Sequence, residues 1–166
     1  GPGLFDDEPR PWMGEGHERL ERLCDEIREP LKDADARLCF RPHARHVLSD
    51  PQGTLDFLRR REEEPFGLAL SPADLLLPDM LESAEDHFER ILQFMVPRCD
   101  FLVAADAAPD PADPDGLLKP CRLGEGVLPA ARLMQAIDEA LTEDAWVVVH
   151  PADLATMTEW RHGDLP

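Results

Sequence analysis

The chain has 166 residues, of which 43% are hydrophobic and 31% are charged. This balance is typical of one folded globular domain and argues against a disordered chain. The net charge of -18 argues against nucleic acid or an anionic membrane as partner, since both need a basic binding surface. No apolar run approaches the length of a bilayer span and the amino terminus lacks a signal-peptide pattern, so we expect a cytoplasmic protein without a membrane partner.

Residues 1–16 are rich in Gly, Pro and acidic residues and predict an irregular lead-in, followed by a single domain over 17–166. A helix is expected from about His17, and Pro30 should bend or end it. Its apolar face repeats at spacings of three and four residues. That face is made by Leu20, Leu23, Cys24, Ile27 and Leu31.

A short strand is predicted over 37–42, where a proline ends the run. Asp50 is the expected N-cap of the next helix, with Pro51 at its first position. The apolar run 66–70 predicts a buried strand. Because short apolar strands alternate with longer amphipathic segments, these elements indicate a parallel sheet with helical crossovers.

The second half of the chain continues the alternation. Ser83 is placed as the cap of a helix, with a carboxylate three residues later. The remaining elements are expected at 83–94 (helix), 101–105 (strand), 106–115 (loop), 129–141 (helix) and 145–149 (strand). The fold class is therefore α/β with about four strands, which fits either a small open sheet or half of an eight-stranded barrel.

The four cysteines lie far apart in the sequence and form no C-x-x-C pair. This spacing matches no zinc module or redox motif, and in a chain of this type it favours buried free thiols over disulfides. The four residues are Cys24, Cys39, Cys99 and Cys121.

Four segments in order resemble one known family. They are the strand at 37–43, the 66–70 strand with its corner from Ser71 to Asp74, the Leu-Gly-Glu-Gly stretch within 121–128, and the strand at 146–151. Together they resemble the xylose isomerase-like barrel superfamily, which includes the sugar phosphate isomerases and epimerases and the family 2 AP endonucleases. The resemblance covers about 17–153 and implies the carboxy-terminal half of a (β/α)8 TIM barrel.

In that family a divalent metal at the barrel mouth is held by two Glu, an Asp and His. The corresponding positions of this chain are Arg41, Ser71, Asp74, Val103 and Val149. Arg and Val are not metal ligands, and a cation at a ligand position repels the metal. We therefore expect no family-type metal site, no cofactor and no metal-dependent proton shuttle.

The mouth is still expected to be polar. The candidate catalytic residues are His43, Asp74, Glu125 and His150, and the candidate ligand-binding residues are Arg41, Asp106, Lys119 and Arg122. Guanidinium groups bind carboxylates and phosphates in two-point contacts, which makes the basic residues a possible anion site. Ordinary roles are favoured for the histidines as surface or backbone-capping residues and for the cations as salt-bridge partners. For Asp74 and Asp106, Asx-turns are at least as strong an interpretation as catalysis.

The resulting hypothesis is a degenerate isomerase- or epimerase-like protein that binds a partner or a small anionic ligand, such as a sugar or sugar phosphate, without metal-dependent catalysis. Two alternatives stay open: an active sugar isomerase or epimerase with a rebuilt site, and a structural or interaction module. A half-barrel also needs its inner face covered, and that face is expected to carry Leu38, Phe40, Leu68, Leu70, Leu102 and Val148 or their neighbours. A homodimer that closes an eight-stranded barrel is favoured over a lead-in segment that covers the open side and over a flattened sheet, and a missing amino-terminal half stays open as an alternative.

Overall fold

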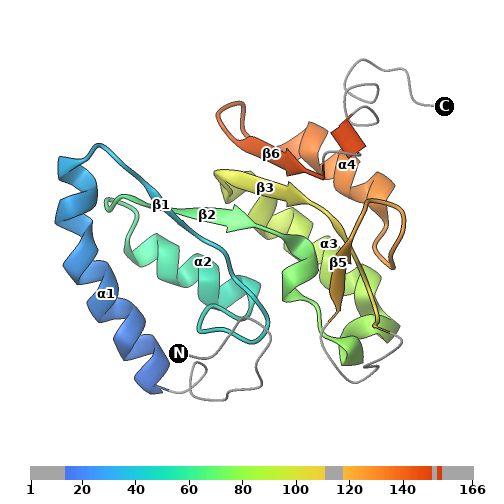
Figure 1. Ribbon diagram of the computed structural model, residues 1–166, viewed down its shortest axis with the longest axis horizontal. Coiled ribbons are helices and arrows are strands. Elements are labelled where there is room, and N and C mark those ends of the chain that lie inside the picture. Colours follow the sequence, from blue (N-terminus) through green and yellow to red (C-terminus); the bar gives the residue numbers. More distant parts are fainter. Residues whose placement is uncertain (1–13, 111–117, 151–152, 155–166) are drawn as a thin grey trace.

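The computed structural model describes residues 14–110, 118–150 and 153–154. Figure 1 shows a twisted sheet with helices packed beside it. The helices and strands are α1 (Gly14–Asp33), β1 (Leu38–Phe40), α2 (Pro51–Arg60), β2 (Phe66–Leu70), α3 (Ala84–Met95), β3 (Phe101–Ala104), β4 (Asp106–Ala108), β5 (Lys119–Cys121), α4 (Ala130–Ala140) and β6 (Trp146–Val149). Three short 3-10 helices flank α3: η2 (Pro72–Leu75), η3 (Pro78–Ser83) and η4 (Val96–Arg98).

The main sheet has four strands in the order β1-β2-β3-β6, and every neighbouring pair is parallel. Strands β4 and β5 form a separate antiparallel ribbon. A strand order that follows the sequence without reversal, with crossovers of one hand, brings successive helices onto the same face of the sheet. This is the winding of a (β/α)8 barrel rather than of a doubly wound open sheet, so the predicted α/β half-barrel is confirmed.

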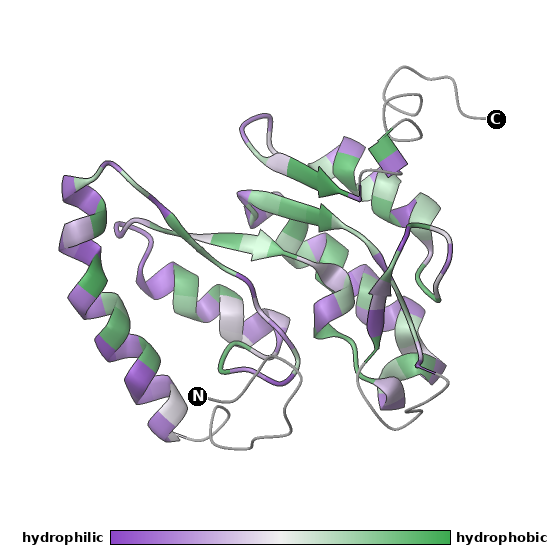
Figure 2. Cartoon of the chain, viewed as in Figure 1, coloured by the Kyte–Doolittle hydropathy of each residue, from purple (hydrophilic) through white to green (hydrophobic). Residues whose placement is uncertain are grey.

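One face of the sheet packs against the helices. The strand residues on this face are buried or packed against the cores: Leu38, Phe40, Phe66, Leu68, Leu70, Leu102, Ala104, Val147 and Val149. Helices α3 and α4 supply the larger core through Phe88, Ile91 and Leu133, and α1 and α2 supply a second core through Cys24 and Phe57. Figure 2 shows apolar residues along β2, β3 and β6 and on the helices beside them.

The face of the sheet that points away from the helices is open, and the residues on it differ from those named in the sequence analysis. Side chains alternate along a strand, so the partners of the helix-facing residues line the open side: Cys39, Gly67, Ala69, Phe101, Val103, Trp146 and Val148. Trp146 is 69% exposed, Val148 47% and Phe101 38%. Of the residues expected on the inner face, Leu38, Phe40, Leu68, Leu70 and Leu102 therefore face the helices, and their sequence neighbours occupy the open side.

Arg37 and Asp100 form an ion pair across the open face, with the Arg37 Nε atom 2.8 Å from Asp100 Oδ1. Asp100 Oδ2 also accepts the backbone N–H of Leu68 at 2.8 Å. A Cβ at residue 67 would overlap both the Asp100 carboxylate and the Arg37 guanidinium, so only glycine leaves room for this pair. The charges on this part of the open face are thus mutually compensated.

Several local predictions are confirmed, and others need correction. Asp50 caps α2 by accepting the N–H of Gly53 at 2.8 Å, as predicted. Helix α1 begins at Gly14, inside the expected lead-in, and runs through Pro30 to Asp33. A proline this close to the helix end removes one N–H donor without breaking the last turn, where the Ala34 N–H reaches the Pro30 carbonyl oxygen.

The second half shows two further differences. Ser83 precedes α3 as expected, but its side chain makes no capping hydrogen bond. The expected loop from 106 begins instead with β4, whose partner β5 is more than ten residues away; residues 111–117 of that loop lie outside the described residues. All four cysteines are free, as predicted, but only Cys24 and Cys99 are buried, whereas Cys39 and Cys121 are half-buried. Across the described residues we find no helix with the length and apolarity needed to cross a bilayer.

Candidate functional site

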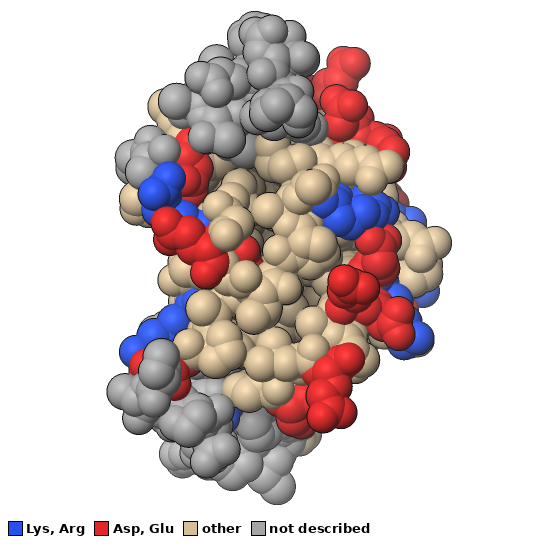
Figure 3. All heavy atoms as spheres, turned by 90° about the vertical axis from the view of Figure 1, so that its right-hand side faces the viewer, with Lys and Arg blue, Asp and Glu red and all other residues tan. Residues whose placement is uncertain are grey.

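The candidate site lies at the carboxyl ends of the parallel strands, where α/β proteins gather their functional side chains. Arg41 follows β1, Asp74 lies in η2 after β2, Asp106 begins β4 after β3, and His150 follows β6. Figure 3 views the molecule from the side toward which these strands point in Figure 1. Basic and acidic groups lie next to one another on this side, and the acidic groups cover more of it.

Arg41 and Asp74 form an ion pair at the β1–β2 end of the candidate site. The Arg41 Nε donates to Asp74 Oδ2 at 2.5 Å. The Asp74 side chain is only 8% exposed, whereas that of Arg41 is 49% exposed. The Asp74 carbonyl oxygen also accepts the Ala44 N–H at 2.8 Å, which joins the loop after β1 to the corner after β2. The carboxylate is thus neutralised by the residue that stands where the family resemblance implies a metal-binding Glu.

His43 is buried, with 6% of its surface exposed. Its Nδ1 atom accepts the backbone N–H of Arg45 at 3.1 Å, and the His43 backbone N–H donates to the Leu48 carbonyl oxygen at 3.0 Å. Burial lowers the pKa of His43 below its ordinary value, against the opposing effect of the nearby Asp74 carboxylate. A neutral imidazole that accepts a local N–H acts as a loop cap, the ordinary role favoured for this residue.

Asp106 is fully buried and accepts four backbone N–H groups. Its Oδ1 atom receives those of Ala107 at 2.7 Å and Leu128 at 2.8 Å. Its Oδ2 atom receives those of Gly124 at 3.2 Å and Gly126 at 3.0 Å. Both oxygens are therefore occupied in folding the Leu-Gly-Glu-Gly segment onto β4. This arrangement gives Asp106 a structural role at the mouth.

Arg122 and Glu125 lie in that same folded segment. Arg122 Nε donates to Asp153 Oδ1 at 2.8 Å, and its Nη1 reaches Glu125 Oε1 at 3.4 Å. Hydrogen bonding to Asp153 raises the pKa of the Arg122 guanidinium further above its ordinary value. The Asp153 N–H in turn reaches the His150 carbonyl oxygen at 2.8 Å. This chain of contacts ties the segment to the end of β6.

Lys119 pairs with Asp110, so each basic residue proposed for ligand binding has a carboxylate partner. Sequence reasoning missed Asp110 and Asp153 as partners, since nothing in the local sequence marks either as close to a given cation. Among the described residues, no three His, Cys, Asp or Glu side chains gather in a way that would hold a metal ion. The residues present therefore do not fit the metal that the resemblance implies.

No family model and no curated protein matches the sequence. Solved structures do match the fold. The probable 3-DHS dehydratase of petrobactin synthesis from Bacillus anthracis aligns with a TM-score of 0.60 at 16% identity, over 89% of this chain and 57% of its own. A xylose isomerase-like TIM barrel protein from Mycobacterium smegmatis, solved in complex with magnesium, aligns with a TM-score of 0.54 at 16% identity, over 99% of this chain and 52% of its own.

These matches confirm the predicted resemblance at the level of the fold. The chain has the fold of the xylose isomerase-like barrels and spans about half the length of the solved structures that it resembles. Half the length agrees with four parallel strands in place of the eight of a closed barrel.

Proposed function

We propose that this chain is one half of a xylose isomerase-like barrel, that a second copy completes the barrel, and that the mouth binds a sugar or sugar phosphate without metal-dependent isomerisation. The observation that carries the proposal is the ion pair between Arg41 and Asp74 at 2.5 Å. In this pair Arg41, a permanent cation, occupies the position where the family resemblance implies a metal ligand.

The donor set argues against metal-dependent chemistry. Ser71 offers one hydroxyl, and Val103 and Val149 offer no donor atom. Divalent metals in such sites need several oxygen or imidazole ligands converging on one point. The buried His43 directs its Nδ1 lone pair to the Arg45 N–H instead. The proton shuttle expected of an isomerase lacks its two Glu residues as well, because Arg41 and Val149 stand at those positions.

The open sheet face supports the pairing of two halves. Parallel sheets are normally covered on both faces, because crossover helices or a closed barrel shield them. Here the helices shield one side, and the other exposes Trp146 and Val148 on the edge strand β6. Strand β1 forms the second edge. A single copy therefore leaves both this apolar face and the backbone groups of two edge strands in contact with water, which is unfavourable.

A second copy meets these requirements by symmetry. A two-fold axis along the barrel axis places β6 of each copy beside β1 of the other, with all eight strands pointing the same way. Isologous dimers of this kind are the commonest oligomers. The open face suits such contact because its side chains are mostly uncharged and Arg37 is paired with Asp100. The contact therefore brings few uncompensated charges together at this face.

A sugar phosphate suits the ion-paired mouth better than a simple anion. Arg41, after the edge strand β1, offers donors to a phosphate, whereas Arg122 and Glu125, in the segment tied to β6, offer a donor and an acceptor to hydroxyl groups. A polyol phosphate uses both kinds of group, while an inorganic anion must displace a carboxylate and gains no hydroxyl contact.

The test is a binding measurement with a panel of pentose and hexose phosphates and the matching free sugars. We expect Arg41→Ala to weaken phosphate-ester binding at least tenfold, and Arg28→Ala, which removes an α1 cation remote in sequence from the strand ends, to leave it unchanged. EDTA treatment and added Mg²⁺, Mn²⁺, Co²⁺ or Zn²⁺ should leave both binding and the melting temperature unchanged. Unaltered sugar phosphate affinity in Arg41→Ala, or one tightly held metal ion per chain, contradicts the proposal.

A further inference from the structure

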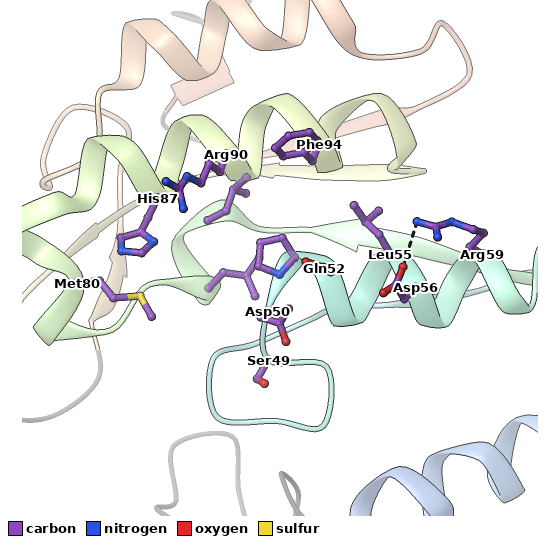
Figure 4. A pocket seen from close by; sticks show the side chains of 13 residues that line it. Ser49, Asp50, Gln52, Leu55, Asp56, Arg59, Met80, His87, Arg90 and Phe94 are labelled. Atoms are coloured by element: carbon purple, nitrogen blue, oxygen red, sulfur yellow. Dashed lines mark ion pairs between the residues drawn. The ribbon is translucent and has the colours of Figure 1, made fainter.

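A groove of about 550 Å³ runs between α2 and α3, in the helical layer of the molecule (Figure 4). Its lining does not include Arg41 or any other residue of the candidate site described above. The volume lies within the ordinary range for small-molecule sites. The groove is therefore separate from the proposed function at the barrel mouth.

The floor and one wall of the groove are apolar. Leu75 and Ile91 are almost fully buried at its base, and Leu55 lines the side that belongs to α2. Phe94, by contrast, is 52% exposed. Because Ile91 and Phe94 lie one helical turn apart on α3, they present a continuous apolar surface along the groove.

Two nitrogen-bearing side chains lie along the same wall. His87 and Arg90 are also one turn apart on α3, and Figure 4 shows the Arg90 guanidinium extending toward His87. Within the part of the chain that the structure describes, no carboxylate pairs with Arg90. Neighbouring arginines do have such partners: Arg59 lies 3.1 Å from Asp56 and Arg132 lies 2.6 Å from Glu89.

Two carboxylates also line the groove, but Asp50 accepts the Gly53 N–H and Asp56 pairs with Arg59, which leaves the charge of Arg90 without a counterion among the described residues of the lining. At the groove, Arg90 adjoins an apolar surface that water solvates poorly. A carboxylate bound there gains a two-point contact with the guanidinium, and an attached apolar body covers Phe94 and Ile91.

We propose that the α2–α3 groove binds a small amphipathic carboxylate, with its carboxylate on Arg90 and His87 and its apolar body over Leu55, Ile91 and Phe94. Charge complementarity selects this class over a neutral apolar ligand. The size of the groove favours a single medium-length chain or one aromatic ring system over a large cofactor.

The experiment uses octanoate and octan-1-ol as matched probes, which differ in charge and share the apolar chain. Calorimetric titration should show tighter binding of octanoate than of octanol. Arg90→Ala should weaken octanoate at least tenfold and change octanol little, and Phe94→Ala should weaken both. Arg98→Ala removes an equal charge from η4, outside the groove, and should change neither.

Circular dichroism on each variant separates loss of binding from loss of fold. Equal affinity for the two probes, unchanged octanoate binding in Arg90→Ala, or no octanoate binding at millimolar concentration each overturns the proposal. Binding of an acidic amphipathic peptide without binding of octanoate also overturns it, because the groove then belongs to a protein partner.

Discussion

The Asp106 carboxylate fixes the backbone of Gly126 at close range. Oδ2 accepts the Gly126 N–H at 3.0 Å, and a Cβ at residue 126 would overlap both Oδ1 and the Ala107 carbonyl oxygen. Glycine is therefore required at this position, and the buried carboxylate organises the whole Leu-Gly-Glu-Gly segment. Asp106, a candidate for ligand binding in the sequence analysis, therefore organises the loop that carries two other candidates, Arg122 and Glu125.

Replacing Asp106 with Asn should destabilise the fold strongly. The amide keeps one acceptor oxygen, so two of the four backbone N–H groups face an NH₂ group instead of an oxygen. An unsatisfied buried donor costs about 1–3 kcal/mol, and we expect a total loss of about 3 kcal/mol in urea unfolding. Asp138→Asn, on the exposed side of α4, should change the unfolding free energy by less than about 0.5 kcal/mol. Equal stability of the two variants would contradict the role of Asp106.

Arg61 should strengthen the attachment of α1 to the rest of the domain, beside the apolar contacts of the second core. Its side chain is 9% exposed, and its Nε atom donates to Glu21 of α1 at 3.0 Å. The guanidinium carbon also lies 5.6 Å from the Phe57 ring centroid, and Nη1 donates to Glu64 at 2.7 Å. These contacts join three segments of the second core.

We expect Arg61→Met to lower the unfolding free energy by about 1–3 kcal/mol, a range that allows for the partial solvation of Glu21. Arg60→Met is the matched control, because Arg60 is exposed and reaches the same Glu21 only at 3.5 Å. It should cost less than about 0.5 kcal/mol. Equal effects of the two substitutions would show that the burial of Arg61 adds nothing.

The buried His43 predicts a specific pH dependence. Its pKa is lowered in the folded protein by burial, with Arg41, Arg45 and His46 adding to the effect and Asp74 opposing it. The unfolded chain, with a pKa near 6.5, therefore binds a proton at a higher pH than the folded chain does. Stability from this group is fully present above about pH 6.5 and declines as the pH falls toward the folded-state pKa.

His43→Asn keeps an acceptor for the Arg45 N–H and removes the titrating ring. Urea unfolding at pH 7.5 and 5.5 should then show a smaller loss of stability on acidification than in the natural sequence. The carboxylates titrate in both proteins, so the difference between their pH-dependent changes in unfolding free energy reports on His43 alone. An identical pH dependence would show that His43 does not titrate differently on folding.

The sequence predicted the sheet and the helices well because each is encoded locally. The strands at 66–70 and 101–105 and the Asp50 cap follow from apolar runs and turn chemistry within a few residues. Helix α1 was expected to bend or stop at Pro30, yet a proline in the last turn disrupts little. Strand β4 was missed because Asp106–Ala108 becomes a strand only through its pairing with the distant Lys119–Cys121.

The candidate site was predicted less completely, because its contacts are long-range. Arg41 and Asp74 were identified separately, but their pairing across 33 residues leaves no local signal. Arg122 and Asp153 are paired in the same way across 31 residues. The two faces of each strand could not be assigned from the sequence either. The alternation of side chains was clear, but only the packed structure shows which alternate set of residues faces the helices.

The exposed face around Trp146 makes the mass of the protein in solution the most direct measurement. Light scattering on a size-exclusion column at micromolar concentration should give about 37 kDa, twice the 18.6 kDa of one chain. Trp146→Asp, which adds a charge to the edge strand on the open face, should reduce this mass to that of one chain, whereas Phe94→Asp on the helical layer should not. A folded, soluble protein of 18.6 kDa at that concentration would contradict closure of the barrel by a second copy.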